Sequence, residues 1–249
     1  MKEFIHDDME FIESGHRYVL KSDPGIEFTS CTTFVNYFFK AFDKVAIAKK
    51  LTATHPNYQN MSPEKLIAQW DQTGIDGVAV HKEVENFINT GALPTLPKSI
   101  QAVEFLQKQN SEAVKIMSEI VVFSKELGIA GTVDLLIYDK ATGCYYLRDW
   151  KTSKKIEMSS YGNKRGNHPA TSAIMDCNYY HYSLQLSLYR YILETCYGIN
   201  ITDCEIYHLT DNSLSSIKCD YHKDIIEEML KADKSELRKK FEDSLTEIN

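Results

Sequence analysis

The chemistry that this sequence can support is concentrated in one segment near its middle. Asp134, Asp149 and Lys151 lie in two runs rich in β-branched and aromatic residues, separated by the turn-forming residues 140–143. If these four residues form the loop of a hairpin, Asp134 lies directly opposite Asp149, with Cβ atoms about 4.5–5.5 Å apart. Lys151 then shares their face, whereas Trp150 points to the other side and into the core.

Two carboxylates placed side by side repel each other unless a cation lies between them. Their oxygens suit a hard divalent ion such as Mg²⁺ or Mn²⁺, which keeps waters and accepts phosphate oxygens as further ligands. Water on such an ion is a nucleophile, and Lys151 would orient it, help to deprotonate it or offset charge at a phosphorus centre. A surface salt bridge explains the hairpin equally well, and a one-residue register slip would turn Asp149 to the opposite face.

The remaining elements are expected from apolar spacing and from turn and capping residues. In chain order they are a hairpin over 16–29 that turns at 23–25, helices over 30–50, 62–73, 76–89 and 99–115, strands over 119–123, 132–138 and 144–150, a helix over 179–197, a strand over 203–209 and a helix over 223–245. The three consecutive strands predict an antiparallel meander in one mixed sheet. The polar residues 152–178 are the best candidate for a mobile loop.

Composition narrows the class of protein. The 249 residues, 43% hydrophobic and 25% charged, fit a single globular domain. A net charge of −7 argues against a protein that coats nucleic acid by bulk electrostatics, but it permits an enzyme with a local basic rim. Apolar runs are too short for a membrane span, and the first residues lack a signal-peptide pattern, so we expect a cytoplasmic protein with no membrane partner. Six scattered cysteines predict free thiols.

Polar residues that could contact a substrate lie after the hairpin. Gln185 and Tyr189 are four residues apart on the expected aromatic helix, with His181 one turn earlier, and together they form a polar stripe. Four basic residues precede this helix: Lys154, Lys155, Lys164 and Arg165. They could bind phosphates, although a charged loop is by default simply solvated.

Four strings together resemble the motifs of the PD-(D/E)XK nucleases, particularly the branch of RecB-type nuclease domains and the mitochondrial genome maintenance exonuclease. They are Gly131-Thr-Val-Asp134, Asp149-Trp-Lys151-Thr152, the Gly-x-x-x-His string that ends at His81, and the Gln-x-x-x-Tyr string that ends at Tyr189. Residues 29–33 also resemble a segment of phage-encoded members. Val133 replaces the proline of the family name, and the second acid is aspartate, which this branch permits.

The resemblance implies roles for individual residues. The Mg²⁺ or Mn²⁺ ligands would be His81, Asp134, Asp149 and the main-chain oxygen of Trp150, and Lys151 would act on the attacking water. Glu119 resembles an earlier acidic residue of the family near the metal. Gln185 and Tyr189 would hold the nucleic acid, together with the basic side chains of Lys154, Lys155 and Arg165.

We therefore expect an α/β protein with a mixed central sheet flanked by helices, a restriction-endonuclease-like α/β/α core. The chain would be one domain, with an N-terminal hairpin and helical decoration over about 1–75, a catalytic core over 76–210 and a C-terminal helix over 221–249. The function expected is a metal-dependent DNA exonuclease, with helices before residue 73 arching over the site. An endonuclease or nickase of the same fold and a non-catalytic DNA-binding module are the alternatives.

Overall fold

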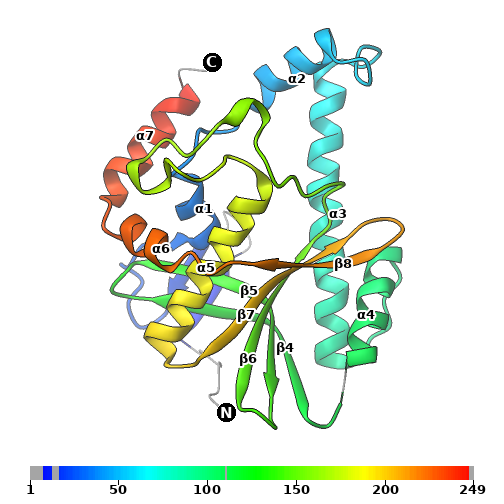
Figure 1. Ribbon diagram of the computed structural model, residues 1–249, viewed down its shortest axis with the longest axis vertical. Coiled ribbons are helices and arrows are strands. Elements are labelled where there is room, and N and C mark those ends of the chain that lie inside the picture. The colour runs from blue at the N-terminus through cyan, green and yellow to red at the C-terminus, as the bar shows by residue number, and fades with distance from the viewer. Residues whose placement is uncertain (1–7, 13–16, 110, 247–249) are drawn as a thin grey trace.

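A mixed six-stranded sheet with helices on both faces forms the centre of the protein (Figure 1). The computed structural model describes residues 8–12, 17–109 and 111–246. The predicted α/β class, with a mixed central sheet flanked by helices, is confirmed. Within these ranges, no helix has both the length and the hydropathy that a membrane span requires.

Three long strands form the predicted antiparallel meander: β4 (Val114–Ser124), β5 (Ile129–Asp139) and β6 (Cys144–Lys151). β7 (Ile201–Leu209) runs parallel to β6, and β8 (Leu214–Cys219) pairs antiparallel with β7. β8 was not predicted, because the sequence LSSIKC has too few apolar residues to signal a strand. β3 (Thr29–Ser30) pairs in parallel with the start of β5.

The predicted hairpin register between β5 and β6 is confirmed from the turn to the pair Leu135 and Arg148. The ladder ends there, one position before Asp134 and Asp149. Beyond this pair, β6 is hydrogen-bonded to β7. On that side of β5, its first residues, Ile129 and Ala130, pair with β3. The two acidic residues therefore lie where β5 and β6 separate.

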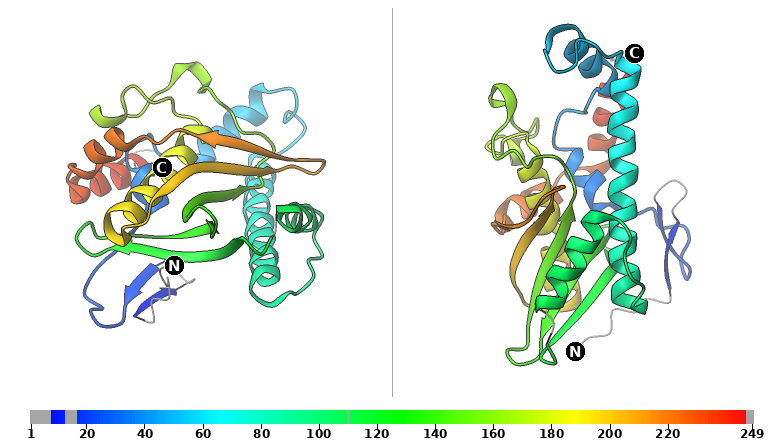
Figure 2. Two further views of the ribbon diagram at one scale, coloured as in Figure 1. Left: turned by 60° about the horizontal axis from the view of Figure 1, so that its bottom comes forward. Right: turned by 90° about the vertical axis from the view of Figure 1, so that its right-hand side faces the viewer.

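Two helical layers cover opposite faces of the sheet, as the views in Figure 2 show. α1 (Cys31–Asn36) and α5 (Asn178–Tyr197) pack on the face that carries Ile206. α3 (Pro63–Thr90) and α4 (Pro97–Gln109) cover the other. The remaining α-helices of the described residues are α2 (Lys44–Thr54), beside α3, and α6 (Lys223–Leu230) and α7 (Lys234–Thr246), near α5 and α1.

The faces of β6 alternate as predicted. Trp150 is buried with Tyr207 in the cluster under α3 and α4, with ring centroids 5.1 Å apart. Lys151 lies on the opposite side, with its Nζ 4.7 Å from the ring centre of Tyr182 on α5.

Several predicted helix boundaries were wrong. The helix predicted over 30–50 is interrupted between α1 and α2, because the carbonyl of Phe38 leaves the helical pattern and accepts hydrogen bonds from Asn167 N and Thr171 Oγ1, both at 3.0 Å. The helices predicted over 62–73 and 76–89 form the single helix α3, which continues through Gly74 and ends at Gly91. The predicted C-terminal helix is divided between α6 and α7, where Asp233 accepts the Ser235 N–H.

The predicted N-terminal hairpin was also wrong in its partners. β2 (Arg17–Leu20) pairs with the preceding strand β1 (Met9–Ile12), and residues 23–25 instead lead the chain towards β3. Asp8 fixes this arrangement, because its carboxylate accepts a hydrogen bond from Ser22 N at 2.7 Å. His16, where the predicted hairpin began, lies outside the described residues.

Candidate metal centre

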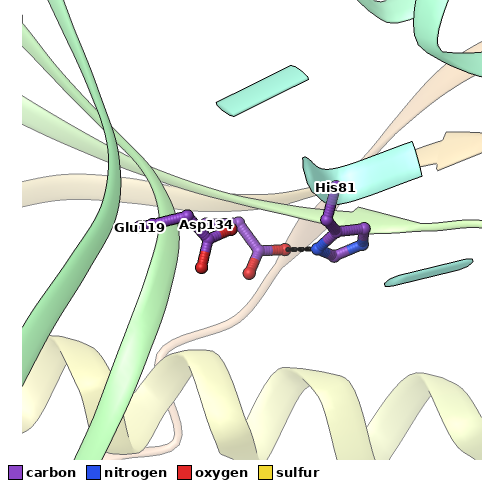
Figure 3. A group of neighbouring side chains, drawn as sticks. All are labelled: His81, Glu119 and Asp134. Carbon is purple, nitrogen blue, oxygen red and sulfur yellow. Dashed lines mark ion pairs between the residues drawn. The ribbon is translucent and has the colours of Figure 1, made fainter. Parts of the chain in front are cut away.

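Three side chains from three different elements converge where β5 and β6 separate (Figure 3). His81 comes from α3, Glu119 from β4 and Asp134 from β5, and one potential ligand atom of each lies within 4.8 Å of the other two. His81 Nδ1 is 3.5 Å from Asp134 Oδ2. A nitrogen and two carboxylate oxygens in this arrangement can hold a divalent cation.

Glu119 reaches the cluster through an unusual backbone conformation. The β4–β5 register places Ser118 opposite Leu135 and Ile120 opposite Val133, so Glu119 faces Asp134 across the two strands. Its φ is +50°, in the left-handed region, and the pair itself drops out of the ladder. For a residue with a side chain, the left-handed backbone conformation costs about 1–2 kcal/mol. Strain of this kind is concentrated at functional sites.

The carboxylates of the cluster crowd one another in a poorly solvated position. Burial, and after it the nearby Asp134 and Glu85 carboxylates, together raise the pKa of the Glu119 carboxyl to about 8. A divalent cation at this position would offset the repulsion that a metal-free protein has to tolerate.

Glycine at position 77 brings α3 close enough for His81 to reach Asp134. A Cβ on Gly77 would lie 2.9 Å from Oγ1 of Thr152, the residue directly after β6. Cβ atoms in proteins essentially never come this close to another heavy atom. Val80 and Val84 pack on the sheet from the same helix. The close approach at Gly77 therefore sets how near the sheet His81 lies, one helical turn later.

Asp149 and Lys151 form a buried ion pair beside the cluster. Lys151 Nζ lies 2.5 Å from Asp149 Oδ2, and the side chains are 17% and 3% exposed. Burial raises the pKa of Asp149 to about 6, against the attraction of Lys151. Burial alone would lower the pKa of Lys151, but the Asp149 and Asp134 carboxylates raise it, so the lysine is an ammonium at neutral pH.

Trp150 links the two strands at the point where they part. Its main-chain N–H donates to Asp134 Oδ2 at 2.8 Å, and this bond holds the Asp134 carboxylate towards His81. Of the expected metal ligands, the structure brings His81 and Asp134 together with Glu119. Asp149 instead pairs with Lys151, and the role of the Trp150 carbonyl stays a prediction.

Gln185 and Tyr189 are adjacent on α5, but their environments differ. Gln185 Nε2 donates to the Tyr189 hydroxyl at 3.2 Å, and Gln185 is half-buried. Tyr189 is buried, and a Cβ on Gly131 would lie 2.5 Å from its ring. Two of the four motifs therefore meet at Tyr189, whose ring packs against Gly131 and whose hydroxyl accepts the hydrogen bond from Gln185.

The basic residues expected to bind phosphate lie on the surface of the loop after β6. Lys154, Lys155 and Arg165 are all exposed. Lys155 Nζ is 2.9 Å from Glu157 Oε1, and Arg165 Nη1 donates to the Ala173 carbonyl at 2.5 Å. None of the three belongs to the cluster of His81, Glu119 and Asp134.

Two residues that the sequence analysis did not single out hold the backbone just after Lys151. Lys98 Nζ donates to the Thr152 carbonyl at 3.2 Å, and His208 Nε2 donates to the Ser153 carbonyl at 2.6 Å. Both partners are more than fifty residues away in the chain. No local signal could have identified them.

Comparison with known proteins gave little guidance. No family model and no curated protein matches the chain. A solved structure titled "Crystal structure of SSO0001" aligns over 88% of this chain and 75% of its own, with 12% identity and a TM-score of 0.36. At that TM-score the likeness supports no conclusion about this protein.

Proposed function

We propose that this protein is a metal-dependent nuclease of the PD-(D/E)XK type that hydrolyses phosphodiester bonds in DNA. The observation that carries the proposal is the convergence of His81, Glu119 and Asp134 from α3, β4 and β5, within 4.8 Å, beside the ion pair of Asp149 and Lys151. Each of these residues was named from the sequence, and the convergence of the first three supports the proposal.

A purely structural explanation of the cluster fits poorly. A surface ion-pair network gains little from a strained backbone and crowded carboxylates. Here Glu119 has a left-handed backbone, and its pKa of about 8 reflects burial and repulsion. Both features destabilise the metal-free fold, so they fit a site that is selected to bind a cation.

The donor set fits Mn²⁺ or Mg²⁺. His81, Glu119 and Asp134 would hold the ion, and bound there it would polarise a phosphodiester and activate water. Carboxylate oxygens suit both ions, whereas the imidazole nitrogen is better matched to Mn²⁺ than to the strictly oxygen-seeking Mg²⁺. We infer that the site prefers Mn²⁺.

Lys151 acts as a cation rather than as a base. The raised pKa keeps it protonated, so its ammonium orients the attacking water and offsets charge that develops on the phosphate. Asp149 fixes the ammonium by the contact of 2.5 Å, and the ring centre of Tyr182 lies 4.7 Å from it. Asp149 then serves first to position Lys151.

Exonucleolytic action is the finer part of the proposal. α2 and the N-terminal half of α3 extend well beyond the sheet as an arm (Figure 1), and residues 71–76 of α3 are all exposed. An arm of this kind beside the site would favour a strand end over a continuous duplex. Gln185 and the basic residues Lys154, Lys155 and Arg165 would contact the nucleic acid.

A labelled-substrate assay tests the proposal. Single-stranded and duplex DNA carrying 5′ or 3′ labels, and RNA of the same sequence, are incubated with Mn²⁺, Mg²⁺ or EDTA. We expect Mn²⁺-dependent release of short products from DNA, lost in Lys151→Ala and Asp134→Asn. Asp139→Asn is the matched control, because Asp139 lies on the same strand but bonds only within the hairpin turn.

The outcomes separate the alternatives. Cutting of covalently closed circular DNA identifies an endonuclease or nickase. Binding of DNA without hydrolysis in any metal, and without a thermal shift on adding Mn²⁺, indicates a non-catalytic module. Equal activity in EDTA and in all variants contradicts the assignment of the site.

A further inference from the structure

The loop between β6 and α5 has an internal scaffold of its own. Gly166 N donates to the Ile174 carbonyl at 3.0 Å, and Asp176 N donates to the Lys164 carbonyl at 2.9 Å. These bonds flank an isolated antiparallel β-bridge between Arg165 and Met175. The buried Thr171 ties the same loop to the segment between α1 and α2. The loop therefore presents its outer turn in a defined position.

The outer turn exposes a large aromatic side chain. Tyr161 is 85% exposed, and Met158 close by in sequence is 54% exposed. Gly162 and Asn163 have φ values of 67° and 54°, and Ser160 Oγ donates to the Lys164 carbonyl at 2.6 Å across the turn. A single exposed aromatic is ordinary on a protein surface, so Tyr161 alone indicates nothing.

The charge around Tyr161 differs in sign from that of the chain. Residues 152–177 contain four basic and two acidic side chains, whereas the whole chain carries a net charge of −7. Both acidic residues are engaged within the protein, Glu157 with Lys155 and Asp176 with His181, each at 2.9 Å. The loop is a local basic surface of the kind that binds phosphates.

A groove lies beside this surface and is lined by Tyr182, the side chain that faces Lys151. Its volume is about 810 Å³, and it lies between α5, the loop and the segment that joins α1 to α2. Lys164 lines it on the loop side, and Gln185 and Tyr182 line it on α5. The ring of Tyr182 also faces Lys151. The groove is therefore linked to Lys151 through Tyr182 and to the exposed turn through Lys164, which follows Tyr161 closely in the chain.

The walls of the groove suit flat apolar groups. Phe42, which is 61% exposed, supplies the accessible aromatic wall, whereas Phe39 in the same lining is buried, at 1% exposed. The imidazole of His181 lies against Phe39 with ring centroids 4.1 Å apart. Aromatic walls with basic residues at the rim are the combination that binds nucleobases and their phosphates together.

We propose that the strand bound at the metal centre continues along this groove, and that Tyr161 stacks on one of its bases at the far end. Lys164 and Arg165 contact the adjacent phosphates. This inference rests on the proposed nuclease function and adds to it a distal binding subsite, with Tyr161 as the residue that sets its position.

Fluorescence of 2-aminopurine tests the subsite without any hydrolysis. The base analogue is placed at successive positions of an oligonucleotide, and binding to the intact protein is measured in EDTA by anisotropy and by quenching. Stacking quenches the analogue at one position along the strand. Tyr161→Ala removes this quenching and weakens binding roughly tenfold, whereas Tyr161→Phe retains both.

Three further arms sharpen the result. Leu93→Ala removes another highly exposed apolar side chain, 81% exposed, and leaves binding unchanged. Lys164→Ala reduces the slope of log affinity against log salt by about one. A blunt duplex with the analogue at its end distinguishes stacking on an unpaired base, which we expect, from stacking on a terminal pair.

The outcomes separate this inference from the proposal on which it rests. If the oligonucleotide binds and Tyr161→Ala leaves both quenching and affinity unchanged, the subsite is wrong and the nuclease proposal stands. If no nucleic acid binds to the unaltered protein in EDTA, the subsite is wrong, and the labelled-substrate assay decides the nuclease proposal independently.

Discussion

Glu119 faces Asp134 across β4 and β5, yet its backbone is left-handed, with a φ of +50°. This kink takes Glu119 out of the ladder, while the register on both sides is unshifted. The two carboxylates then meet His81 in one cluster. The protein therefore holds two acids together at a cost in backbone strain and in repulsion, and the first two predictions measure that cost.

Replacing Glu119 should stabilise the metal-free protein. Glu119→Gln removes a carboxylate that is raised to a pKa of about 8 by burial and by Asp134. We expect the free energy of unfolding in EDTA at pH 7 to rise by about 1–3 kcal/mol. Glu119→Gly should gain in addition from relief of the left-handed backbone. Urea unfolding checks both, and a loss of stability in both variants would contradict this account of the site.

The stabilisation should depend on pH in a defined direction. The folded-state pKa of Glu119 lies above its ordinary value of 4.5, so its contribution to stability is full below about pH 4.5 and is lost as the pH rises through about 8. The difference in stability between Glu119→Gln and the unaltered protein should therefore grow from pH 4.5 to pH 8. Melting temperatures in EDTA across this range measure it, and a difference that stays constant with pH would remove the support for a buried, repelled carboxyl.

Metal binding should reverse the order of stability of the unaltered protein and Glu119→Gln. At a Mn²⁺ concentration about 100 times its Kd, the unaltered protein should gain roughly 2.7 kcal/mol, or about 5–10 °C in Tm. His81→Ala, Glu119→Gln and Asp134→Asn should each lose most of this shift, whereas Asp139→Asn should keep it. Mg²⁺ at the same concentration should give a smaller shift. Equal shifts in all variants would place the ion elsewhere on the chain.

Local turn chemistry explains why the active hairpin could be predicted. Asp139 accepts hydrogen bonds from Ala141 N at 2.8 Å and from Thr142 Oγ1 at 2.9 Å, and Gly143 has a φ of 73°. These contacts lie within the turn, so the sequence specifies them directly and fixes the register. The alignment of Asp134 with Asp149 follows from that register.

Long-range contacts explain what could not be predicted. The break after α1 depends on Phe38 bonding to Asn167 and Thr171, far along the chain. Glu119 was named from the sequence as an acidic residue near the metal, but no sequence pattern signals the left-handed backbone with which it lies there. The helices expected over 62–73 and 76–89 are one helix, α3, which continues through Gly74.

Two glycines on α3 offer a matched pair that tests how His81 is positioned. At Gly74 an added Cβ meets nothing within 4 Å, whereas at Gly77 it would lie 2.9 Å from Thr152 Oγ1. Gly74→Ala should stabilise the protein by up to about 1 kcal/mol, because alanine is the better helix former. Gly77→Ala carries the same gain in propensity but should lose about 1–3 kcal/mol, because α3 has to move away from the strand end.

The same movement should be visible in metal binding. Withdrawal of α3 at Gly77 carries His81 away from Asp134, so Gly77→Ala should bind Mn²⁺ about tenfold or more weakly, while Gly74→Ala binds it as tightly as the unaltered protein. Calorimetric titration of both variants measures the difference. Equal Mn²⁺ affinity in the two, with Gly77→Ala folded, would show that the close packing of α3 on Thr152 serves stability alone and that His81 is placed by other contacts.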